Sequence, residues 1–164
     1  MFNKTGVATL EMIKEILPSE ERRKKGPYAV FECFQEIPCN PCYTSCKVGA
    51  VQEFKDINNI PQVDADKCTG CGICVSNCPG LAIFVIDETY SDEEAAIKIP
   101  YELLPLPEKD QVVDALDREG KIIGKARVIK VQNSKALNKT NAVTIAVPKD
   151  QAMLVRHIGW GENS

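Results

Sequence analysis

The chain has 164 residues and a formal net charge of −3, with 44% hydrophobic and 26% charged residues. This length and composition predict one buried core or two small ones and exclude a mostly disordered chain. The weak negative charge gives no basic surface for nucleic acid, so binding to nucleic acid is not expected. No segment reaches the length of a membrane-spanning helix, so no membrane span is expected.

The beginning of the chain predicts helical structure. The first five residues lack the basic and long apolar regions of a secretory signal, so we expect a cytoplasmic protein with reduced thiols. Residues 6–17 carry apolar side chains at helical spacing between Thr5, a suitable N-cap, and Pro18, a stop. Such a stripe usually packs on its own domain, and the alternative is docking on a partner subunit. Residues 19–25 are strongly polar and predict a short helix or linker.

Short strands are predicted before and after each part of a cysteine-rich segment. They cover residues 28–32, 50–54, 60–64 and 81–86. Residues 28–54 therefore match residues 60–86 as an internal repeat. Residues 51–100 hold nine acidic and three basic side chains, which could dock on a basic partner or simply form a solvated face.

The remainder of the chain is β-patterned. Residues 95–99 are expected to pair back on residues 81–86 as a hairpin. Three prolines then form a stiff connector, at which we place a domain boundary: Pro100, Pro105 and Pro107. Further strands are predicted at residues 112–116, 122–131, 142–147 and 151–157, with a helical turn at 149–156 as the alternative to the last. Short antiparallel strands in this number favour a small β-barrel or sandwich.

All eight cysteines lie in two blocks of four between residues 33 and 78. The second block is Cys68, Cys71, Cys74 and Cys78 followed by Pro79, with the spacing C-x2-C-x2-C-x3-C-P. The first block is Cys33, Cys39, Cys42 and Cys46, with the same spacing except that five residues fill the first gap. Such runs are typical of iron–sulfur clusters, and Gly70 and Gly72 would let the loop amides approach the sulfides. Two structural zinc sites are the alternative, but zinc ribbons separate their cysteine pairs by a long spacer.

On these motifs, residues 28–87 resemble the bacterial two-cluster ferredoxins. The resemblance implies two 4Fe–4S clusters, with the fourth cysteine of each block binding the cluster of the other block. One cluster would be held by a first cysteine set, Cys33, Cys39, Cys42 and Cys78. The other would be held by a second cysteine set, Cys68, Cys71, Cys74 and Cys46. For the whole chain we expect an α+β fold, in which this two-cluster ferredoxin-like domain lies between an N-terminal helix and the C-terminal small antiparallel β-barrel or sandwich.

The chain departs from the family pattern in three places. The gap between Cys33 and Cys39 is longer, Lys47 replaces the proline after Cys46, and Pro41 removes one amide donor from the first block. A first cluster without Cys33 would have three ligands and could be a 3Fe–4S species, but we expect Cys33 to bind. The altered hydrogen bonding should separate the two reduction potentials.

Residues 25–42 and 142–148 are similar to small ferredoxin-like subunits of multi-subunit FAD-dependent dehydrogenases that act on amino or imino acids. This similarity implies a flavoprotein partner that carries the FAD, and this chain has no G-x-G-x-x-G or G-x4-G-K-S/T nucleotide motif. No catalytic group is expected, since His157 is the only histidine. We expect three parts: a helical segment (1–25), a two-cluster ferredoxin domain (26–99) and a small β-domain (100–164).

The expected function is electron transfer between a flavoprotein subunit and another donor or acceptor. The N-terminal helix and the β-patterned C-terminal part favour a subunit, because a free ferredoxin needs neither. A free-standing ferredoxin carrier is the alternative. A third interpretation is a binding module in which the clusters have only a structural role.

Overall fold

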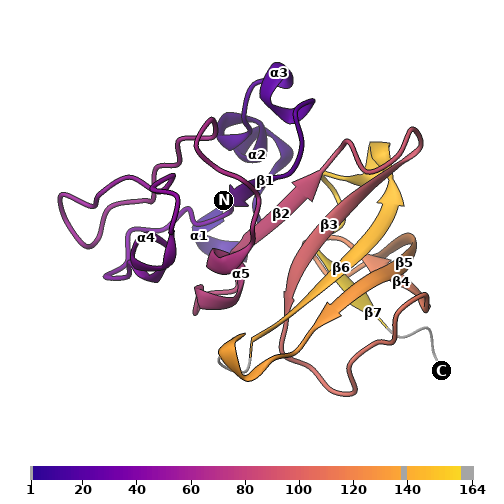
Figure 1. The fold of residues 1–164 in the computed structure, drawn as a ribbon. Helices are drawn as coiled ribbons and strands as arrows, with labels where there is room; N and C mark the ends of the chain where they lie inside the picture. The colour runs from indigo at the N-terminus through magenta and orange to yellow at the C-terminus, as the bar shows by residue number, and fades with distance from the viewer. Residues whose placement is uncertain (1, 138–139, 160–164) are drawn as a thin grey trace.

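The computed structural model describes residues 2–137 and 140–159. Its helices are α1 (Phe2–Thr5), α2 (Leu10–Ile16), α3 (Glu20–Arg23), α4 (Pro41–Ser45) and α5 (Ile73–Asn77), with 3₁₀ turns η1 (Lys135–Leu137) and η2 (Lys149–Gln151). Its strands are β1 (Tyr28–Phe31), β2 (Ile83–Asp87), β3 (Glu94–Tyr101), β4 (Val112–Leu116), β5 (Ile122–Gln132), β6 (Asn141–Pro148) and β7 (His157–Gly159). Figure 1 shows α1 to α4 and their loops on one side of the molecule and strands β3 to β7 on the other. No helix in these two ranges is long and apolar enough to cross a membrane.

The strands form a single antiparallel sheet in the order β1-β2-β3-β6-β5-β4-β7 (Figure 1). The separate small β-barrel or sandwich predicted for residues 100–164 is therefore wrong, because the sheet is open and continuous. The physical reason is that β3, paired with β2 on one side, would otherwise leave the backbone groups of its other edge unpaired. Strand β6 covers this edge along its whole length, from Glu94 opposite Pro148 to Tyr101 opposite Asn141. This pairing crosses residue 100, and the division of the chain there stays a prediction.

Strands β1 and β2 are buried on both faces. Tyr28 and Val30 of β1 point into a large core that extends across β3 to β7. Ala29 and Phe31 point to the opposite face, into a smaller core that includes Cys42. Alternate side chains of a strand face opposite ways, so the β1–β2 pair separates the main core from the cysteine-rich loops. The sheet thereby supplies a rigid wall for those loops.

The helical start of the chain is split into two pieces. The sequence predicted one helix from residue 6 capped by Thr5, but α1 ends at Thr5 and α2 begins at Leu10. Gly6 has a φ of 68°, a left-handed conformation that interrupts the helix. Thr9 caps α2 instead, since its Oγ1 accepts a hydrogen bond from the Met12 N–H at 3.4 Å.

Three other predicted strands are shorter or displaced. Residues 50–54 and 60–64 form only one isolated bridge, between Val51 and Val63. Pro61 has no N–H to donate, which limits a longer ladder there. Residues 151–157 do not form the predicted strand, because η2 leads into a turn and β7 begins only at His157. The helical-turn alternative for this segment agrees with the structure.

Candidate iron–sulfur site

The first cysteine set lines one cavity of about 210 Å³. Cys33 follows β1, Cys39 lies in the lengthened loop, Cys42 is in α4 and Cys78 follows α5. Apolar side chains form much of the remaining wall: Phe2, Phe31, Phe34, Ile37 and Ile83. Cys42 is buried and the other three cysteines are partly exposed. The structure thus places Cys78, from the second block, beside three cysteines of the first block.

The second cysteine set lines another, smaller cavity. Cys46 follows α4, whereas Cys68, Cys71 and Cys74 lie in the loop before α5 and in its first turn. Cys71 is exposed, and the other three are partly exposed. The exchange of fourth cysteines between the blocks is therefore present in their placement. That these residues bind clusters stays a proposal.

Both cavities offer a donor set that suits an iron–sulfur cluster. All eight cysteines are free thiols, and soft thiolate ligands with apolar walls are characteristic of such sites. In the part of the chain that the structure describes, no three His, Cys, Asp or Glu side chains converge closely enough to hold one metal ion. The cysteines instead lie around the walls of a shared space. The residues present fit a multinuclear group.

Backbone amides surround the sulfur of Cys46. Burial raises the pKa of this thiol, but hydrogen bonds from the N–H groups of residues 48–51 outweigh that effect and lower the pKa below its usual value. At the corresponding position in the second block, the Ala82 N–H donates to Cys78 Sγ at 3.5 Å. Amides directed at sulfur stabilise the thiolate that a metal requires.

Cys42 of the first set and Cys74 of the second have the opposite tendency. Burial raises the pKa of Cys42 to about 11 and that of Cys74 to about 12. Neighbouring thiolates of the same set raise both pKa values further. These thiols are therefore neutral near neutral pH unless a metal binds. Cluster loading is expected to release their protons.

Two glycines allow the second cysteine loop to pack closely. Gly70 and Gly72 have φ values of 67° and 79°, which side-chain-bearing residues rarely adopt. A Cβ atom on Gly70 would lie 2.6 Å from the Pro27 Cβ, and one on Gly72 would lie 2.8 Å from Lys98 Cδ. Both glycines therefore hold the loop in a shape that a larger residue would strain.

Replacing Gly70 with alanine is expected to reduce iron occupancy of the second cysteine set. The left-handed backbone alone costs about 1–2 kcal/mol for an alanine, and the collision with Pro27 adds to that cost. Gly120→Ala is the matched control, because Gly120 has a φ of 79° with open space around it and lies in the β4–β5 turn. Iron analysis should show a greater loss in the Gly70 variant. Equal occupancy in the two variants would contradict this account of the loop.

Two cationic side chains contact the outside of the same loop, and no local sequence pattern predicted either contact. Arg22 of α3 is buried, and its Nη2 donates to the Cys68 carbonyl at 2.6 Å. Its other guanidinium hydrogen bonds go to the carbonyl oxygens of Ala65, Gly26 and Pro27. Lys98 of β3 donates from Nζ to the Cys71 carbonyl at 3.2 Å. Burial and the nearby Lys130 lower the pKa of Lys98, and Cys71 and Cys74 oppose this shift.

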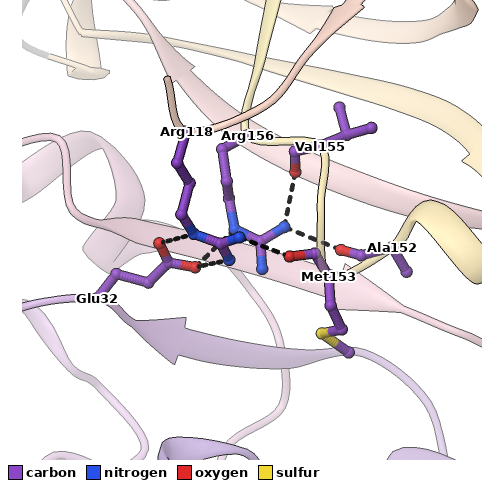
Figure 2. A network of polar contacts seen from close by, with 6 residues as sticks. All are labelled: Glu32, Arg118, Ala152, Met153, Val155 and Arg156. Atoms are coloured by element: carbon purple, nitrogen blue, oxygen red, sulfur yellow. Dashed lines mark hydrogen bonds and ion pairs between the residues drawn. The ribbon is translucent and has the colours of Figure 1, made fainter. Parts of the chain in front are cut away.

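A buried charge network lies next to the first cysteine set. Figure 2 shows the carboxylate of Glu32, the residue before Cys33, facing the guanidinium groups of two arginines of the C-terminal part. Glu32 accepts from Arg118 Nη2 and Nε at 2.6 and 2.8 Å and from Arg156 Nε at 2.6 Å. Other arginine N–H groups donate to the carbonyl oxygens of Ala152, Met153 and Val155 (Figure 2). Burial raises the pKa of Glu32, but the two guanidinium groups outweigh it and lower the pKa.

This network was missed at the sequence level because its members are far apart in the chain. The side chains of Glu32, Arg118 and Arg156 are only 8%, 11% and 4% exposed. The Arg156 guanidinium also lies over the Phe84 ring, 5.2 Å from its centroid. The network joins the segment that leads into Cys33 to the chain around β7.

Comparisons with known proteins agree with the cysteine geometry. Residues 61–84 match the family model of the 4Fe-4S binding domain. The chain is 42% identical over 71 residues to pyruvate synthase subunit PorD of Methanocaldococcus jannaschii, a match covering 41% of this chain and 80% of the relative. PorD of Methanothermobacter marburgensis is 33% identical over 69 residues, covering 40% of this chain and 78% of the relative. No solved structure is significantly similar.

The thiol-lined cavities and the matched motif together define an iron–sulfur protein of the electron-transfer class. The chain belongs to the 4Fe–4S ferredoxin-like family. A shorter match, 46% identical over 39 residues, is to the thiosulfate reductase electron transfer subunit PhsB of Salmonella typhi. That match covers 24% of this chain and 19% of the relative. Each of these three matches covers less than half of this chain.

Proposed function

We propose that this chain is an electron-transfer subunit carrying two 4Fe–4S clusters, one on each cysteine set. The observation that supports this most strongly is the grouping of eight thiols around two cavities, with the fourth cysteine of each block in the other set. When bound, such clusters supply reversible one-electron oxidation and reduction. The chain's own residues provide the thiolates, the amide donors and the apolar walls.

The two proposed sites are close neighbours. Phe31 lines both cavities, and the buried Cys42 and Val75 belong to the same small core. Helix α4 carries Cys42 of the first set and helix α5 carries Cys74 of the second, and the two helices lie against each other. Electrons could therefore pass between the two sites within this chain, as a relay requires.

The parts outside the cysteine loops support a subunit rather than a minimal carrier. Strands β3 to β7 extend the sheet well beyond the β1–β2 pair, and Glu32 is joined to them through Arg118 and Arg156. PorD and PhsB, to which parts of this chain are similar, are named as subunits of pyruvate synthase and thiosulfate reductase. We propose a cytoplasmic complex in which the partner is a flavoprotein dehydrogenase subunit carrying FAD.

Anaerobic purification of the tagged chain from its own cells tests this function. A copurifying flavoprotein in fixed ratio is expected, with about eight iron atoms per copy of this chain. FAD should be found on the partner and not on this chain after the two are separated. A chain that is recovered alone, monomeric and reversibly reducible would overturn the subunit proposal in favour of a free-standing ferredoxin.

A further inference from the structure

We infer that Lys98 and Arg22 raise the reduction potential of the cluster proposed for the second cysteine set. This inference rests on the proposed function, because it assumes a cluster bound by Cys46, Cys68, Cys71 and Cys74. Neither cation belongs to the cysteine-rich segment: Arg22 comes from α3 and Lys98 from β3. Both reach the loop that carries three of the four thiols.

Lys98 contacts the most exposed part of the second set. Its Nζ lies 3.2 Å from the carbonyl oxygen of Cys71, which is the exposed cysteine. The lysine stem passes so close to Gly72 that a Cβ atom there would lie 2.8 Å from both Cδ and Nζ. The glycine therefore makes room for the lysine. This close approach holds the ammonium group against the loop.

Arg22 places a second cation on the other end of the loop. Its four guanidinium hydrogen bonds all go to carbonyl oxygens, one of them Cys68 O. Among residues 2–137 and 140–159, neither Arg22 nor Lys98 forms an ion pair with a carboxylate. Arg118 and Arg156, beside the first set, differ in this respect because both are paired with Glu32.

A cation near the cluster site favours reduction for an electrostatic reason. One-electron reduction adds a negative charge at the site, so a fixed positive charge stabilises the reduced form more than the oxidised form. Screening is weaker for a half-buried or buried group than for an exposed one. Other charges near the loop come as opposite pairs: Lys67 is paired with Asp64 at 3.4 Å, and Lys25 and Asp66 line the same hollow as Arg22. Lys130 adds to the positive field at Lys98.

Lys98→Gln tests the inference without disturbing a buried side chain such as Arg22. Potentiometric titration of the reconstituted chain, followed by EPR, should show one cluster shifted to a more negative potential. We expect the equilibrium constant for its reduction to fall about threefold to tenfold, where tenfold is about 59 mV. Lys98→Arg should restore most of the potential. The reduction potential of the other cluster should not change.

Lys67→Gln is the matched control, because it also removes a positive charge near the loop. Lys67 precedes Cys68 but is 63% exposed and paired with Asp64. Its replacement should therefore produce a clearly smaller shift than Lys98→Gln. A Cys39→Ser background assigns the signal, since the Lys98 effect should persist when the first cysteine set is incomplete.

The inference is overturned if Lys98→Gln moves neither potential, moves both equally, or moves no more than Lys67→Gln does. Loss of the shift in the Cys39→Ser background would also overturn it, because the effect would then belong to the first set. These outcomes are distinct from failure of the proposed function. That failure would be a wild-type chain lacking two reducible clusters, whatever Lys98 does.

Discussion

Serine replacement of Cys68 and Cys74 together is expected to remove one cluster and leave the other, lowering iron from about eight to about four atoms per chain. Both residues line the second cavity and contribute nothing to the wall of the first. Cys39→Ser/Cys42→Ser is the matched pair, because these two residues line only the first cavity. Each double variant should keep the cluster that the other loses, as judged by iron content and EPR.

The fourth cysteines make this prediction more discriminating. Cys46 belongs to the first block in the sequence but lines the second cavity. Cys46→Ser should therefore weaken the same cluster as the Cys68/Cys74 variant, and Cys78→Ser the same cluster as the Cys39/Cys42 variant. A chain in which each block binds its own cluster would give the reverse result. The proposed ligand sets would then have to be abandoned.

Replacing Glu32 with glutamine is expected to destabilise the fold by about 3–5 kcal/mol, the range for breaking a buried ion pair by removing one partner. The carboxylate is shared by two arginines whose side chains are 11% and 4% exposed. Without it, Arg118 and Arg156 remain buried beside each other as like charges. Arg156 has little capacity to compensate, since its Nη2 is already without a hydrogen-bond partner in the part of the chain that the structure describes.

Urea unfolding under anaerobic conditions, followed by circular dichroism and by cluster absorbance, measures this effect. Glu36→Gln is the control, because Glu36 lies in the same loop but is exposed. Its unfolding midpoint should stay close to that of the wild type. Replacing all three network residues with apolar ones, Glu32→Leu with Arg118→Met and Arg156→Met, should recover much of the lost stability. Equal midpoints for the Glu32 and Glu36 variants would show that the network contributes nothing.

Local patterns predicted much of the sheet correctly. Strand β4 has the predicted bounds, and β1, β2, β3, β5 and β6 lie within a few residues of them. The hairpin of β3 on β2 also formed as expected. The predictions for these segments are correct because β-branched and alanine-rich runs bounded by turn residues leave few alternatives to a strand. The long pairing of β3 with β6 could not be predicted from local patterns, since the periodicity of a strand does not show which other strand pairs with its edge.

The cysteine sets were predictable for a different reason. Their spacing carries the family resemblance, which implied that Cys78 joins the first set and Cys46 the second. The structure has Cys78 at the first cavity and Cys46 at the second, and cluster binding there stays a proposal. The surrounding charges had no such signature. Arg22 stands among three other basic residues of similar sequence environment, and Glu32 meets Arg156 across 124 positions. Long-range contacts of this kind depend on the sheet, whose topology the sequence did not reveal.

Metal and sulfide analysis of the anaerobically reconstituted chain, combined with EPR on reduction, tests the central proposal most directly. The two-cluster account predicts about eight iron atoms and about eight sulfides per chain, with two reducible 4Fe–4S signals. About seven iron atoms with a 3Fe–4S signal would mean that Cys33 does not bind. A single 4Fe–4S cluster with zinc on the other cysteine set, or clusters that stay unreduced between about −700 and +450 mV, would contradict a two-cluster electron-transfer protein.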